Sequence, residues 1–180
     1  MTSTAPFPSQ KRIVITFSLA VFLFALSAWV VAVYLPIYLE KVLGFSRSYI
    51  GLLISIYSVT LIVLVAPLGH LSDRVSPRRI VQVGLLFFAA YCFALAGVQT
   101  VALLAAAQVL GGFGNSLVII ALHSLFYKHL TLSRKGRKLG LYMFAMFFGF
   151  SVGPLVSGFL LKRCGLSYRA IFLIAGGVIV

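Results

Sequence analysis

The sequence predicts an all-α integral membrane protein. Of its 180 residues, 62% are hydrophobic and 9% are charged, and the mean hydropathy is +1.12. Soluble domains carry roughly 25% charged residues. Apolar stretches long enough to cross a bilayer as helices, which takes about 20 residues each, recur along the chain. A water-soluble domain of this length could not bury so much apolar surface, so we expect the lipid bilayer to surround the protein.

Short polar segments set the bounds of the expected helices. The predicted spans are 13–39, 49–68, 80–98, 101–126 and 139–161. The first is longer than the roughly 7–15-residue apolar core of a signal peptide, so an uncleaved span is favoured over a cleaved leader. The segment 169–180 is apolar but short, and we expect the chain to end inside its sixth helix. Residues 1–12 are then a cytoplasmic tail, and residues 13–180 form one six-helix bundle.

The distribution of Lys and Arg predicts the orientation in the membrane. If the N-terminus is inside, ten basic residues lie on that side: Lys11, Arg12, Arg74, Arg78, Arg79, Lys128, Arg134, Lys135, Arg137 and Lys138. The other side has Lys41, Arg47, Lys162, Arg163 and Arg169. Because cytoplasmic loops are enriched in Lys and Arg, we expect a multi-pass protein of the plasma or inner membrane with a cytoplasmic N-terminus.

A short motif that occurs twice in the sequence suggests an inverted repeat. Gly69-x-Leu71-x-x-Arg74 recurs as Gly158-x-Leu160-x-x-Arg163, each at the end of a predicted span. The two copies fall on opposite sides of the membrane, as two inverted three-helix repeats require. Chance similarity between apolar spans is the alternative explanation.

Composition and spacing exclude several classes of function. The net charge of +13 is spread between apolar stretches instead of forming one stripe, so nucleic acid is not an expected partner. The cysteines and histidines show no metal-ligand spacing, and we expect no metal and no cofactor. An intramembrane serine protease is rejected because Ser116 and His123 share one helix, and a base must reach the nucleophile from another element. We do not expect an enzyme.

The most informative motif is Gly69-His-Leu-Ser-Asp73-Arg74-Val-Ser76-Pro-Arg78-Arg79, placed between the second and third spans. It resembles the cytoplasmic signature of the major facilitator superfamily, which has Gly, three residues, Asp, Arg, any residue, Gly and then basic residues. Ser76 stands where the family usually has Gly. The resemblance covers essentially the whole chain, but only the N-terminal half of a usual twelve-helix transporter.

This resemblance implies a role for the charged turn as a conformational latch. In the family, the Asp and the basic residues link the helical bundles and set the balance between inward-open and outward-open states. The residues to which this role transfers are Gly69, Asp73, Arg74, Arg78 and Arg79. The alternative is that these charges only set topology and bind lipid head groups, although topology alone does not require Asp73.

The fifth span resembles a family motif associated with proton-driven export. It contains Gly149, Gly153, Pro154 and Gly158, with Ser157 in place of the first of two final glycines. Small residues at this spacing let helices approach closely, and a proline bends a helix, so plain packing is the alternative. In the fourth span Gln108 replaces the Arg of many exporters, and no acidic residue lies deep in a span. Energy coupling is therefore not visible in this half, and His123 is expected to lie at the interface.

Candidate substrate contacts lie on the first and fourth spans, which line the central cavity in this superfamily. Ser27, Tyr34 and Tyr38 share one helical face, as do Gln108 and Asn115. Hydrogen bonding to neighbouring helices is the alternative role for the buried amides.

The resemblance implies a secondary active transporter that moves a small-molecule substrate by alternating access, and the fifth-span motif favours a proton-coupled exporter. It also implies a missing C-terminal half or a second subunit as partner. The alternative is a non-transporting membrane protein, or a truncated remnant that needs a partner half.

Overall fold

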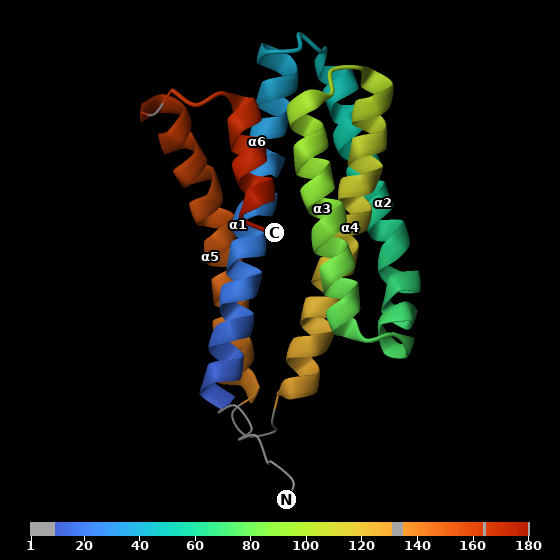
Figure 1. Cartoon of the computed structure of the whole chain (residues 1–180), viewed down its shortest axis with the longest axis vertical. Helices are drawn as coiled ribbons and strands as arrows, with labels where there is room; N and C mark the ends of the chain where they lie inside the picture. Colours follow the sequence, from blue (N-terminus) through green and yellow to red (C-terminus); the bar gives the residue numbers. More distant parts are fainter. Residues whose placement is uncertain (1–9, 131–134, 164, 180) are drawn as a thin grey trace, which may run out of the picture.

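The computed structural model contains six α-helices that run roughly parallel to one long axis (Figure 1). It describes residues 10–130, 135–163 and 165–179, apart from the side chain of Asp73. The helices are α1 (Gln10–Lys41), α2 (Arg47–Arg74), α3 (Pro77–Gly97), α4 (Val101–His129), α5 (Lys135–Arg163) and α6 (Tyr168–Gly177). Among the described residues, the first five are long and apolar enough to cross a membrane, and α6 is a shorter apolar helix. The all-helical membrane fold is thus confirmed.

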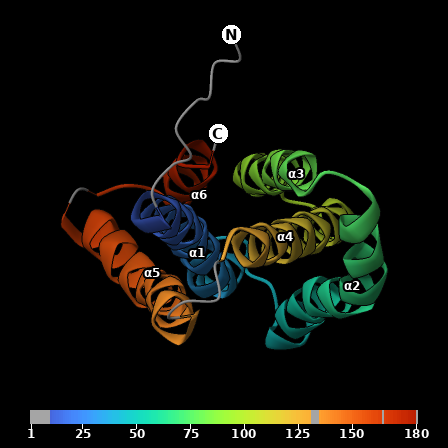
Figure 2. The same cartoon turned by 90° about the horizontal axis from the view of Figure 1, so that it is seen from below.

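The helices pack as two interleaved repeats. α1 contacts α5 and α6, whereas α4 contacts α2 and α3, and these two groups stand side by side in Figures 1 and 2. If α1 is exchanged with α4, α2 with α5 and α3 with α6, the α1–α5 contact becomes the α4–α2 contact. In the same way the α1–α6 contact becomes the α4–α3 contact. Because α1 and α4 also run in opposite directions, this is the arrangement of two inverted three-helix repeats.

Helix α2 is longer than the sequence predicted and includes much of the charged motif. Gly69 to Arg74 form its last turns, and Pro77 begins α3, so the connection consists of Val75 and Ser76 alone. Proline is favoured in the first turn of a helix because it has no N–H to leave unpaired. The prediction that the whole motif is a turn was therefore wrong, since its polar residues are compatible with helix ends at a water interface.

The two ends of the bundle differ in charge. We call the end where α1 and α5 begin the basal end, and the opposite end, where α2 and α4 begin, the apical end (Figure 1). Of the ten basic residues assigned to the N-terminal side, all but Arg134, which lies outside the described residues, are at the basal end. The exposed Arg47–Glu40 ion pair, at 3.3 Å, joins α1 to α2 at the apical end. Exposed pairs of this kind contribute little to stability.

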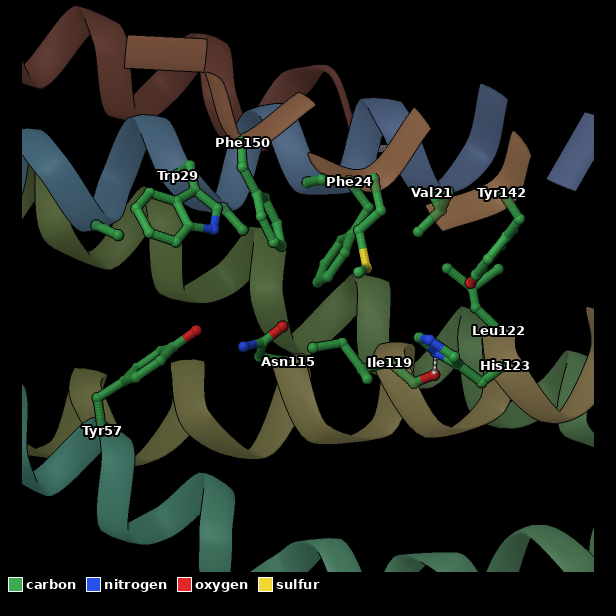
Figure 3. Close-up of a pocket in the computed structure, with 14 residues that line it drawn as sticks. Val21, Phe24, Trp29, Tyr57, Asn115, Ile119, Leu122, His123, Tyr142 and Phe150 are labelled. Carbon is green, nitrogen blue, oxygen red and sulfur yellow. Dashed lines mark hydrogen bonds between the residues drawn. The ribbon is translucent and has the colours of Figure 1, made fainter. Parts of the chain in front are cut away.

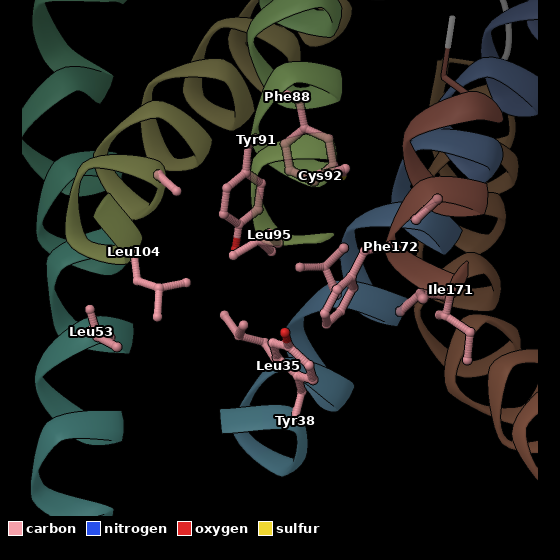
Figure 4. Close-up of a cluster of buried hydrophobic side chains, with 14 of the residues drawn as sticks. Leu35, Tyr38, Leu53, Phe88, Tyr91, Cys92, Leu95, Leu104, Ile171 and Phe172 are labelled. Atoms are coloured by element: carbon pink, nitrogen blue, oxygen red, sulfur yellow. The ribbon is translucent and has the colours of Figure 1, made fainter. Parts of the chain in front are cut away.

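An apolar core in the apical half holds both helix groups together (Figure 4). Leu39 from α1, Leu53 from α2 and Leu95 from α3 are each fully buried there. Phe172 from α6 packs edge-on against Tyr38, with ring centroids 5.5 Å apart. Residues of the same core also reach the middle of the bundle, among them Phe24 of α1 and Phe88 of α3.

Candidate substrate cavity

A cavity of about 200 Å³ lies between the two helix groups (Figure 3). Four helices line it: α1, α2, α4 and α5. Most of its wall is apolar or aromatic, as in most small-molecule sites. Its lining residues are Val21, Phe24, Ala25, Ala28, Trp29, Ala32, Tyr57, Asn115, Ile119, Leu122, His123, Tyr142, Met146 and Phe150.

Aromatic rings form much of the wall on the side of α1 and α5. Trp29 packs against Phe150 with ring centroids 5.0 Å apart, and Trp29 is 41% exposed at the rim of the cavity. Phe24 lies deeper and packs edge-on against Phe88 of α3 at 5.2 Å. Flat, apolar surfaces of this kind suit aromatic ligands, because rings pack well edge-on or offset.

Asn115 is the polar group at the middle of the cavity. It is 7% exposed, and its Oδ1 atom has no hydrogen-bond partner among the described residues. Tyr57 of α2 points its hydroxyl toward the same space (Figure 3). Buried polar atoms are nearly always hydrogen-bonded, so an unpaired amide oxygen at a cavity is suited to a ligand.

A second polar group lies toward the basal end and combines His123 with Tyr142. The Nδ1 atom of His123 is 2.7 Å from the main-chain oxygen of Ile119, and its ring lies 5.3 Å from that of Tyr142, nearly perpendicular to it. Tyr142 is fully buried, and its hydroxyl has no partner among the described residues. The structure places His123 in the cavity wall, which the sequence did not predict, while its expected place at the membrane interface stays a prediction.

A smaller cavity of about 80 Å³ adjoins the first and shares Ala28, Ala32 and Tyr57 with it. Gln108 lines this space and is 2% exposed. Its Oε1 accepts a 3.0 Å hydrogen bond from the Tyr91 hydroxyl of α3. Gln108 therefore links α4 to α3 by a hydrogen bond, which is the alternative role proposed for a buried amide. It also lines the smaller cavity.

The three candidates on α1 share one face, as predicted, but this face lies against α5 and α6. Ser27 is buried in a small recess formed with both helices. Tyr34 donates a 3.1 Å hydrogen bond to the main-chain oxygen of Pro154, and Tyr38 is buried beside Tyr168 and Phe172. None of the three lines either of the two adjoining cavities, because α1 turns a different face to them.

The small residues of the fifth span lie where α5 crosses α1. A Cβ at Gly149 would be 2.6 Å from the main-chain oxygen of Phe22, and one at Gly153 would be 2.6 Å from that of Leu26. A Cβ at Gly158 would meet the Tyr34 hydroxyl at 2.8 Å. Only glycine permits this approach of the two backbones. Pro154 lies inside the helix, and its carbonyl accepts the Tyr34 bond described above.

Glycines of α4, for which sequence analysis gave no role, provide the matching approach in the other group. A Cβ at Gly112 would be 2.8 Å from the main-chain oxygen of Tyr57, and one at Gly114 would be 2.7 Å from the main-chain nitrogen of Phe88. Ser116 donates a 2.8 Å hydrogen bond to the main-chain oxygen of Gly112 within α4, and its hydroxyl also lies 3.4 Å from the main-chain oxygen of Leu61 in α2. Helix α4 therefore packs closely against both α2 and α3. This packing positions Asn115.

The predicted latch residues lie at the basal end. Arg74, Arg78 and Arg79 are exposed, and a Cβ at Gly69 would meet open space. The side chain of Asp73 lies outside the described residues. The latch therefore stays a prediction, and its basic members are available to a partner at this end.

Sequence analysis missed Tyr57, Tyr142 and the cavity position of His123. Tyr57 and Tyr142 lie on the second and fifth spans, for which the sequence predicted no cavity residues. His123 follows Asn115 by eight residues, and this spacing would have indicated that the two side chains share one face of the fourth helix. The aromatic residues carry no such signal, since they are equally suited to packing against lipid.

Comparison with known proteins agrees with this architecture. Residues 17–180 match the sequence profile of the family described as Major Facilitator Superfamily. The chain is similar to the Quinolone resistance protein NorA of Staphylococcus aureus, with 28% identity over 159 residues that cover 88% of this chain and 40% of NorA. It is also similar to Multidrug resistance protein 1 of Bacillus subtilis, with 25% identity over 118 residues, or 66% of this chain and 30% of that protein.

The chain thus spans less than half the length of these two relatives. The matched region nonetheless includes all six helices, except the first residues of α1. Together with the inverted three-helix repeats, the profile match shows that this chain belongs to the major facilitator superfamily.

Proposed function

We propose that the chain forms the N-terminal half of a secondary transporter that exports small aromatic molecules, with the larger cavity as its share of the substrate site. The observation that carries this proposal is the aromatic-walled cavity between the two helix groups, which is lined by helices of both inverted repeats and has Asn115 at its middle. In transporters built from such repeats, substrate binds near the middle of the bilayer at the repeat interface.

The relatives support export as the direction. Two proteins similar to this chain are named for resistance, one to quinolones and one to multiple drugs. Resistance is consistent with removal of a compound from the cell. The aromatic wall of this cavity would suit compounds of that general kind, since stacking depends on shape more than on one functional group.

The basal end is proposed to face the cytoplasm. Its excess of Lys and Arg follows the positive-inside pattern. In that orientation the predicted latch of Gly69, Asp73, Arg74, Arg78 and Arg79 is cytoplasmic, and the cavity lies between it and the apical core. Alternating access would then close the basal side during export.

A C-terminal half or a second subunit is the proposed partner. Helices α2 and α5 carry many exposed apolar side chains, among them Ile62 at 70% and Leu155 at 72%. Lipid covers some of this surface in any membrane protein. The remaining wall of the substrate site is proposed to come from the partner, because the four lining helices leave the cavity partly open.

The first test is the intact mass of the protein isolated from its native membrane. A mass more than twice 19.5 kDa would support a twelve-helix carrier. A mass equal to 19.5 kDa would mean that a dimer or a separate partner is needed, and a non-transporting protein would become the better proposal.

The second test is efflux of a fluorescent aromatic dye from drug-sensitive cells that express the complete protein. Asn115→Leu should slow efflux several-fold by removing the amide at the middle of the cavity. Gln82→Leu, which also replaces a side-chain amide by Leu but at an exposed position of α3, is the matched control and should leave efflux unchanged. Absence of efflux by the wild-type protein against a range of dyes would contradict the proposed function.

A further inference from the structure

The basal end of the cavity contains two polar groups that the proposed function does not use. His123 reaches it from α4 and Tyr142 from α5 (Figure 3). Their rings are 5.3 Å apart and nearly perpendicular. The Tyr142 hydroxyl has no hydrogen-bond partner among the described residues, although the side chain is fully buried. A buried hydroxyl left unpaired is costly, so a ligand group here would stabilise it.

The hydrogen bond of His123 determines which ring nitrogen faces a ligand. Its Nδ1 lies 2.7 Å from the Ile119 carbonyl oxygen, which only accepts hydrogen bonds, so Nδ1 carries the proton. In the neutral ring Nε2 is then an acceptor, and after protonation it becomes a second donor. Protonation therefore changes His123 from a neutral acceptor into a cationic donor at this end of the cavity.

The charges around this site are basic wherever the structure describes them. No acidic side chain lines the cavity in the described part of the chain, and the two acidic residues of the sequence are Glu40, at the apical end, and Asp73. Tyr142 on α5 and Tyr57 on α2 are the other titratable groups in the cavity wall. The basic groups at the basal ends of the surrounding helices are Lys11, Arg12, Arg74, Arg78, Arg79, Lys128, Lys135, Arg137 and Lys138, and the histidines there are His70 and His129.

We propose that His123 and Tyr142 form a binding site for the carboxylate of an aromatic acid. The carboxylate accepts one hydrogen bond from the Tyr142 hydroxyl and one from protonated His123 Nε2. Its ring system lies along Phe24 and Phe150 toward Asn115. This inference rests on the proposed transport function and names a substrate class for it. Charge-assisted hydrogen bonds are stronger than neutral ones, so the site favours an ionised acid over its amide.

Binding of naphthalene-2-carboxylate and of the neutral naphthalene-2-carboxamide to the purified complete protein tests the proposal. Calorimetric titration should give a carboxylate affinity about tenfold higher at pH 5.5 than at pH 8, because a cationic His123 makes a charge-assisted hydrogen bond to the carboxylate. The carboxamide affinity should stay constant, because it carries no charge. In His123→Gln, the carboxylate affinity should lose its pH dependence.

His129→Gln is the matched control. His129 lies six residues further along the same helix, and its Nδ1 makes the same contact with a carbonyl one turn earlier, Leu125 O at 2.8 Å. It is exposed and does not line the cavity. This variant should keep the full pH dependence. Tyr142→Phe should lower the carboxylate affinity about fivefold at both pH values and affect the carboxamide less.

Proton uptake gives a second measurement that does not depend on a variant. If protonation strengthens carboxylate binding, carboxylate binding must promote protonation to the same degree. Adding the carboxylate to wild-type protein at a pH between 5.5 and 8 should therefore withdraw protons from a weakly buffered solution. No proton uptake, or an unchanged pH dependence in a folded His123→Gln protein, would overturn the site. Failure to bind either probe would instead overturn the proposed aromatic substrate class, and the site with it.

Discussion

The backbone of Gly149 in α5 lies directly against the Phe22 carbonyl of α1, so that a Cβ at position 149 would be 2.6 Å from that oxygen. This contact and its neighbour at Gly153 join two helices that are more than a hundred residues apart in sequence. The α1–α5 pair supplies one aromatic wall of the cavity, including Trp29 and Phe150. Close helix packing and the shape of the proposed site are therefore linked.

Gly149→Ala should destabilise the protein, whereas Gly140→Ala should not. In an exposed part of a helix, Ala is favoured over Gly by about 1 kcal/mol. Gly140 lies on the same helix with nothing within 4 Å of an added Cβ, so its replacement should be neutral or slightly stabilising. At Gly149 the clash with the backbone of α1 should reverse the sign. Thermal unfolding in detergent measures both, and equal shifts would contradict the proposed close approach.

Gln108 and Tyr91 should behave as a coupled pair. Gln108→Leu removes the acceptor of a buried 3.0 Å hydrogen bond and leaves the Tyr91 hydroxyl unpaired. The cost should be about 1–3 kcal/mol, and adding Tyr91→Phe should recover part of it, because the orphaned hydroxyl is then gone. Unfolding of the single and double variants gives the coupling energy. Additive effects would mean that the hydrogen bond contributes nothing.

Asp73→Arg should impair transport by the complete protein if the predicted latch operates. The expected loss is on the order of tenfold or more, the scale of a coupling between conformational states. Glu40→Arg is the matched control, since Glu40 is the other acidic residue of this chain and lies at the apical end. Both variants are compared at equal surface expression in a dye-efflux assay. Unchanged transport in Asp73→Arg would remove the latch role.

Trp29 should report ligand binding directly. It is the single tryptophan among these 180 residues and lies at the rim of the cavity beside Phe150. An aromatic ligand in the cavity should quench its fluorescence by contact with the indole. The difference between wild-type and Trp29→Phe protein isolates this signal from any tryptophan elsewhere in a longer chain. A ligand that binds without changing this difference would not occupy the larger cavity.

Much of the architecture followed from local sequence. Apolar stretches of membrane length predicted the five long helices, and the charged motif predicted the region in which α2 ends and α3 begins. The predicted end of the second span was six residues too early, because Gly69 to Arg74 are polar enough for a loop and yet remain helical at the end of α2. The glycines of the fifth span indicated a close helix contact, but not that the partner would be α1.

The sequence by itself determined the membrane class, the order of the helices and the uneven distribution of basic residues, because these depend on composition and on spacing along one chain. The tertiary structure decided which helical face meets which neighbour. It directed Ser27, Tyr34 and Tyr38 toward α5 and α6, and it brought His123 and Tyr142 together in the cavity wall. Helices hydrophobic on every side give no periodic signal for the buried face, so only their packing against one another assigns it.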